Sequence, residues 1–151
     1  MKRVVWQNIT VGKSEYSKID DGEFLLRRIH KNNYDQSHQT SVKRPAFEPG
    51  KNDDDGLSFH REVFISAKTL AYCGRKPGEY VIARFSVKDF TSDEIRLAVQ
   101  EKPDEDQPPG HCVLPKLNTS FATQQKGPAK ELQRKLAVMA SARIIYKPPG
   151  L

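Results

Sequence analysis

Hydrophobic and polar residues alternate most regularly over Glu79–Val87, near the middle of the chain. Every odd-numbered position from Val81 to Val87 is apolar, whereas the even-numbered positions include Arg84 and Ser86. A period of two, rich in β-branched and aromatic residues, is typical of a strand with one face on a core. Because the second face is only half polar, the stretch is predicted to be a central strand.

A second strand is predicted over Glu23–His30. Leu25, Arg27 and Ile29 point one way, and the intervening residues, which end in Arg28 and His30, point the other way. The remaining strand candidates are shorter. They are Val4–Trp6, Ile9–Val11, Leu57–His60, Ile95–Val99 (expected to pair with Glu79–Val87), His111–Leu114 and Ile144–Tyr146.

One long helix is predicted over Ala129–Ala142, with Pro128 at its first position. Its apolar residues form a single stripe, Leu132, Leu136, Met139 and Ala140, which is typical of core packing. A shorter helix is predicted near Ser66–Cys73, with Ser66 as N-cap and Gly74 as its end. We therefore expect an α+β fold: a mainly antiparallel sheet of about five strands with one long C-terminal helix and one short helix.

Two polar segments, residues 31–56 and 101–110, contain most of the turn-forming residues. Phe47 is expected to fix the first of them to the body of the protein. With 151 residues, the chain is long enough to bury a core, and residues 1–151 are expected to form a single domain.

Composition bears on the cellular location of the protein. No apolar run reaches the length of a membrane helix, and the first residues carry charge but no secretory apolar stretch, so we expect a cytoplasmic protein. Cys73 and Cys112 are too few for a disulfide framework and are expected to be free thiols. The formal net charge is +6.

The positive charge gathers in two segments, near residues 27–47 and 126–147, with acidic runs between them. Such segments either attract nucleic acid or form part of a mixed, solvated surface. Lys126, Lys130 and Arg134 follow one another at a spacing of four on the outer face of the long helix. They are the candidate nucleic-acid surface.

Metal and cofactor motifs are not supported. Asp53, Asp55, Gly56 and Glu62 match part of a calcium-binding EF-hand loop, but Lys51 occupies the first ligand position. The cysteines and histidines lack the close pairing of a structural zinc site, and no phosphate-binding glycine loop is present. We expect no metal and no cofactor.

Arginine and histidine side chains recur at the ends of the predicted strands. Arginine suits phosphate or carboxylate, and histidine can act as an acid or a base near neutral pH. If the strands converge, these side chains would form one anion-binding cluster. Its candidate members are Arg27, Arg28, His30, His60, Arg61, Arg84 and His111.

Four short pieces carry a resemblance: Leu25–His30, Arg44–Phe47, Asp55–Ser58 and Pro109–His111. In these pieces the chain resembles a family of small uncharacterised bacterial proteins, over about Leu25 to Leu117, which implies a bacterial cytoplasmic origin. The chain also resembles, more weakly, ADP-ribosyltransferase-like domains. That resemblance would give a role to Arg27, Arg28 or His30 and to Ser58, although a late catalytic Glu is missing.

Two functions remain open from the sequence. The first is a binding or accessory module for an anionic partner, nucleic acid or protein, in a multi-gene bacterial system. The alternative is a small metal-independent enzyme acting on a phosphate-containing substrate, such as a ribonuclease or an ADP-ribosyltransferase-like domain.

Overall fold

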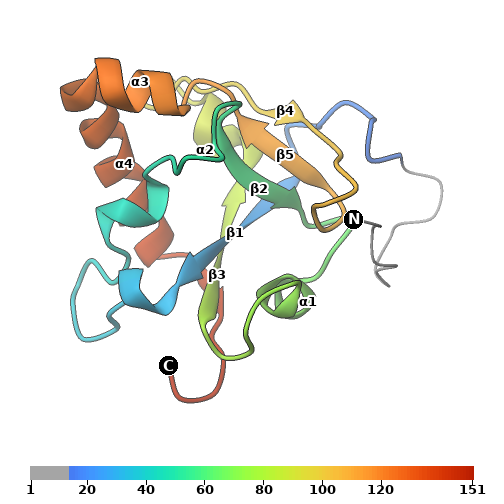
Figure 1. Ribbon diagram of the computed structural model, residues 1–151, viewed down its shortest axis with the longest axis vertical. Coiled ribbons are helices and arrows are strands. Elements are labelled where there is room, and N and C mark those ends of the chain that lie inside the picture. The colour runs from blue at the N-terminus through green and yellow to red at the C-terminus, as the bar shows by residue number, and fades with distance from the viewer. Residues whose placement is uncertain (1–13) are drawn as a thin grey trace.

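A twisted antiparallel sheet runs through the centre of the protein in the computed structural model, which describes residues 14–151 (Figure 1). The predicted strands at Val4–Trp6 and Ile9–Val11 lie outside the described residues. The elements follow in the order β1 (Phe24–His30), the 3-10 turns η1 (Lys31–Asn33) and η2 (Arg44–Phe47), β2 (Leu57–Arg61), α1 (Ala67–Tyr72), β3 (Tyr80–Ser86), α2 (Val87–Thr91), β4 (Gln100–Glu101), β5 (His111–Leu114), α3 (Thr119–Gln124), α4 (Lys126–Ser141) and β6 (Ile144–Tyr146).

The six strands are arranged in the order β4-β5-β2-β1-β3-β6, with every pair antiparallel. The pairing of β1 with β3 is the longest, from Phe24 opposite Ser86 to His30 opposite Tyr80. On its other side β1 pairs with β2 at only two positions, Leu25 with Arg61 and Leu26 with His60. The expected α+β class, the central position of β3 and the antiparallel sheet are confirmed, with six strands.

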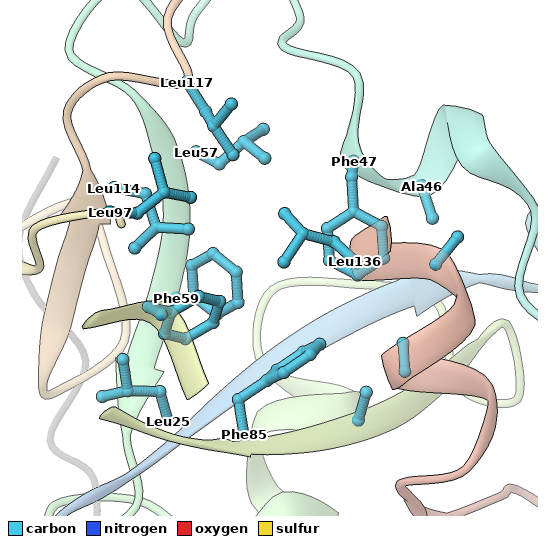
Figure 2. Packing of buried hydrophobic residues seen from close by; sticks show 14 of the residues in the cluster. Leu25, Ala46, Phe47, Leu57, Phe59, Phe85, Leu97, Leu114, Leu117 and Leu136 are labelled. Atoms are coloured by element: carbon cyan, nitrogen blue, oxygen red, sulfur yellow. The ribbon is translucent and has the colours of Figure 1, made fainter. Parts of the chain in front are cut away.

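One face of the sheet carries the main core. The aromatic rings of Phe47, Phe59, Phe85 and Phe90 meet edge to face or tilted, and Leu136 of α4 packs among these residues (Figure 2). Phe47 is fully buried, so it does fix the segment 31–56 to the body. The helices α3 and α4 lie on this side of the sheet (Figure 1).

The opposite face is covered by α1, which packs Leu70 and Ala71 on Leu26 and Ile82. Ser66 caps α1 as predicted: its hydroxyl accepts a hydrogen bond from the backbone N–H of Thr69. Because α1 has only six residues, it covers the β1–β3 side of this face. The side chains of β2 and β5 that project from this face are therefore not covered by a helix.

The prediction of a strand over Ile95–Val99 is wrong. Ile95 and Leu97 are buried as expected, but Arg96 between them has a φ of 55°, which breaks an extended backbone. The neighbours of β3 are β1 and β6, and the short strand β4 begins only at Gln100. Alternating apolar residues here reflect a loop that points two side chains into the core.

Two short helices were not predicted from the sequence. Ser86 and Asp89 form a capping box that starts α2 directly after β3, and Asn118 caps α3 by accepting from the N–H of Phe121. The long helix α4 begins at Lys126, two residues before the proline that was predicted to open it, so that Pro128 lies within its first turn. A proline is tolerated there because the first N–H groups of a helix have no internal partner.

None of the helices in residues 14–151 combines the length and apolar character needed to cross a membrane.

Candidate active site

A polar cluster occupies the part of the sheet face that α1 leaves free. We call it the Ser–His cluster and define it as Arg28 of β1, Ser58 and His60 of β2, and His111 of β5. The register of β2 with β5 places His60 opposite His111 and Ser58 opposite Val113. Ser58 and His60 are two residues apart on one strand, so both side chains project from the same face.

Ser58 and His111 are directly hydrogen-bonded, with 2.9 Å between the Ser58 Oγ and the His111 Nε2. The other ring nitrogen of His111, Nδ1, lies 2.7 Å from the carbonyl oxygen of Lys102. Since a carbonyl can only accept, Nδ1 carries the proton and Nε2 of the neutral ring presents its lone pair to the Ser58 hydroxyl. This arrangement of hydroxyl, imidazole and orienting acceptor is the one that activates a nucleophile.

The Lys102 carbonyl is itself held in place from the same strands. The backbone N–H of Lys102 donates to the carbonyl of His111 at 3.0 Å, and its ammonium group pairs with Asp55. Asp55 precedes β2 by two residues, so the ion pair ties the segment that orients His111 to the start of the strand that carries Ser58. His111 is thus fixed by contacts on both sides.

Burial sets the protonation of both histidines. His111 is 5% exposed and His60 3% exposed, and desolvation lowers the pKa of each ring. The positive charge of Arg28 lowers both values further. Both rings are therefore neutral at pH 7, which is the state in which His111 can accept a proton.

His60 lies beside the bonded pair, with 5.4 Å between its ring centre and that of His111. Its Nε2 atom is buried and has no hydrogen-bond partner of ordinary geometry among the described residues, although the side chain of Gln107 lies close enough to the ring to oppose the lowering of its pKa. Leaving a buried polar atom unpaired costs about 1–3 kcal/mol, and such groups are typical of sites kept for chemistry or for a ligand.

Arg28 and Ser58 are half-buried and are the members of the cluster that solvent reaches best. The Arg28 guanidinium donates to the carbonyl of Cys73 at 2.7 Å, and burial lowers its pKa to about 10, so it stays charged at pH 7. The cluster therefore combines a serine hydroxyl hydrogen-bonded to a neutral imidazole with a fixed cation on one face. A substrate that carries an anionic group next to an electrophilic atom fits this combination.

The structure places Arg27 and Arg61 away from this face, in contacts with the protein itself. Arg27 lies among the rings of Phe47 and Phe59 and donates to the carbonyls of Ala46 and Ser58, and burial lowers its pKa to about 10. Arg61 is fully buried and forms a bidentate ion pair with Glu23, at 2.8 and 2.7 Å. Arg27 thus positions the backbone of Ser58, and Arg61 anchors the segment before β1.

His30 and Arg84, the other two predicted members, each have a separate acidic partner. His30 lies 3.6 Å from Glu79 at the end of β1, and Arg84 lies 2.8 Å from Glu62. Of the seven residues predicted to converge, the structure brings together Arg28, His60 and His111.

The pairing of Ser58 with His111 was not among the predictions from the sequence. The signal for it was present: Ser58 and His60 alternate on one face of a predicted strand, directly after Asp55 and Gly56. The part played by the Lys102 carbonyl left no trace in the sequence, because any residue supplies a carbonyl oxygen.

No His, Cys, Asp and Glu side chains gather in groups of three or more that could hold a metal ion anywhere in residues 14–151. Cys73 and Cys112 are both buried free thiols, as predicted.

Comparison with protein-family models, with curated proteins and with solved structures finds no match to this chain. The resemblance to small bacterial proteins and to ADP-ribosyltransferase-like domains stays a prediction.

Proposed function

We propose that this protein is a metal-independent enzyme acting on a phosphate-containing substrate, with Ser58 as the nucleophile and His111 as the general base. The observation that carries this proposal is the hydrogen-bonded series from the Ser58 hydroxyl through His111 to the Lys102 carbonyl. It corresponds to the enzyme alternative of the two functions open from the sequence.

The proposed step moves one proton and exchanges one bond. The Ser58 Oγ attacks the phosphorus atom and forms an O–P bond, while its proton passes to Nε2 of His111. The bond from phosphorus to the leaving oxygen breaks, and the protonated His111 returns its proton to that oxygen. The Lys102 carbonyl stabilises the imidazolium ring by holding Nδ1–H, and the charge of Arg28 stabilises the phosphate oxygens.

The protonation state of the cluster favours catalysis over simple anion binding. A site that only captured an anion would gain from charged histidines, whereas burial keeps both His60 and His111 neutral at pH 7. Neutral imidazole is the form required of a general base. Arg28 supplies the one fixed positive charge of the cluster.

A fluorophosphonate probe tests the proposal, because an activated serine displaces fluoride from its phosphorus atom. We expect peptide mapping to find the phosphonyl group on Ser58, and EDTA to leave the reaction unchanged. The variant Ser58→Ala should not be labelled. His111→Gln should be labelled about 10²–10⁴-fold more slowly, the usual contribution of a general base.

The control is Ser120→Ala, since Ser120 is exposed on α3, away from the cluster. This variant should be labelled like the parent protein. The enzyme proposal would be contradicted if Ser58 were labelled no faster than an ordinary exposed serine, or if His111→Gln did not slow the labelling. Either result would favour a non-catalytic anion-binding module. If inorganic phosphate protects Ser58 from labelling and the variant Arg28→Met abolishes that protection, then Arg28 binds the anion.

We also propose a cytoplasmic, bacterial setting. The two buried free thiols support a reducing compartment, where unpaired cysteines are the rule.

A further inference from the structure

A basic groove lies on the other side of the sheet, between η2 with its following loop and the start of α4. Its volume is about 360 Å³, and Arg44, Lys51, Lys126, Lys130, Glu48 and Gln133 are among the residues that line it. Because α4 packs on the main core face and the Ser–His cluster lies on the α1 face, the groove is a separate site.

The floor of the groove is fixed by Arg44. Its guanidinium donates to Oε1 of Gln133 at 2.6 Å and to Glu48 at 2.9 Å. Gln133 is 2% exposed, so this contact anchors the arginine to the buried side of α4. Glu48 is the one carboxylate that lines the groove itself, and Arg44 neutralises it. Asp53 and Asp54 lie at the edge, where they accept hydrogen bonds from the lining residues Gly50 and Thr119.

Three further cations surround this floor without acidic partners. Lys51, Lys126 and Lys130 are exposed, and none has a carboxylate within 4 Å among the described residues. A cluster of like charges destabilises itself through repulsion, and an anion bound in the groove would relieve that repulsion.

The start of α4 adds to the positive potential. No acidic residue occurs in its first turn, and Gln125 provides no side-chain cap for the free N–H groups. The positive end of a 16-residue helix therefore lies beside Lys126 and Lys130. The helix N-terminus, the three lysines and Arg44 all favour an anionic ligand.

We propose that this groove binds the sugar–phosphate backbone of a single-stranded nucleic acid. Several separate cations along an open groove match successive phosphates better than one phosphate ion, and a concave surface accepts a single strand. None of the lining residues is aromatic, so the groove would hold the phosphates and sugars, which carry no sequence information, and would give the bases no ring to stack on. The structure thus groups Lys126 and Lys130 with Lys51 and Arg44, whereas Arg134 lines a different depression with Glu131 and Val138.

Binding of fluorescein-labelled oligothymidylate, measured by anisotropy over a series of salt concentrations, tests the proposal. The test variant is Lys126→Gln with Lys130→Gln. Each lost phosphate contact flattens the plot of log affinity against log salt by about 0.7 for a single strand. We expect a slope reduced by about 1.4 and affinity at 50 mM salt weakened by more than about tenfold.

The matched control is Lys68→Gln with Arg134→Gln, which removes the same charge at exposed positions outside the groove. It should leave both affinity and slope close to those of the parent protein. The proposal is overturned if the parent does not bind at low salt, or if the control weakens binding as much as the test variant. Displacement of the oligonucleotide by equimolar inorganic phosphate would also overturn it, in favour of a single-phosphate site.

Discussion

The hydroxyl oxygen of Ser58 lies 2.9 Å from Nε2 of His111, although the two residues are 53 positions apart in the chain. The pairing of β2 with β5 brings them together, and the segment after β4 supplies the Lys102 carbonyl that fixes the imidazole. Three neighbouring segments at one edge of the sheet thus each contribute one group to this hydrogen-bonded series.

Acidification should destabilise the protein through His60 and His111. Both side chains have an ordinary pKa of about 6.5 in the unfolded chain, and burial lowers that pKa in the folded protein. Below about pH 6.5 the unfolded chain therefore binds more protons, so the free energy of unfolding falls as the pH decreases. The loss is at most about 1.4 kcal/mol per pH unit for each histidine, and it ends below the folded pKa.

Denaturant unfolding at pH 7.5 and pH 5.5 measures this effect. The double variant His60→Gln with His111→Gln should show a smaller difference between the two pH values than the parent. His38, whose side chain is 70% exposed, provides the control, and His38→Gln should keep the parental difference. An unchanged difference in the double variant would show that the buried rings do not govern acid sensitivity.

Gly56 should be among the least replaceable residues near the cluster. Its φ is 118°, and a Cβ built there would lie 2.2 Å from the carbonyl oxygen of Leu114 on β5. Gly56→Ala must therefore force β2 and β5 apart or twist the backbone, and we expect a loss of about 2–5 kcal/mol in the free energy of unfolding.

Gly74→Ala is the matched control for Gly56→Ala. Gly74 also has a positive φ, 61°, but a Cβ there would meet nothing within 4 Å. Only the conformational penalty of about 1–2 kcal/mol should remain. Equal losses in the two variants, measured by denaturant unfolding, would mean that close packing on β5 is not what requires a glycine at Gly56.

Leu136→Ala should cost about 2–5 kcal/mol, because Leu136 is fully buried in the core beside Phe47 and truncation leaves a cavity (Figure 2). Lys130→Ala on the exposed side of α4 should change the free energy of unfolding by no more than about 0.5 kcal/mol. A loss at Lys130→Ala equal to that at Leu136→Ala, in the same denaturant titration, would show that the stripe on α4 is not the packed side.

Local patterns determined the elements with strong periodicity. The alternation over Tyr80–Ser86 and Phe24–His30 fixed both strands and the faces of their side chains. On α4, Leu136 and Ala140 of the predicted stripe are buried, whereas Leu132 and Met139 are only partly buried and the buried side also includes Gln133. These patterns suffice because burial of one face dominates the stability of such elements. The same alternation gave a wrong strand prediction at Ile95–Val99, where a loop buries Ile95 and Leu97 but does not pair with a strand.

The sequence by itself also determined which residue types are available for chemistry, and it named Arg28, His60 and His111 among its candidates. Only the tertiary structure decided which of the candidates meet. Arg27 and Arg28 are adjacent in the chain, yet opposite faces of β1 send one to backbone carbonyls in the core and the other to the Ser–His cluster. Strand order and register, which depend on contacts between residues far apart in the chain, placed Ser58 beside His111 and turned a serine and a histidine into a hydrogen-bonded pair.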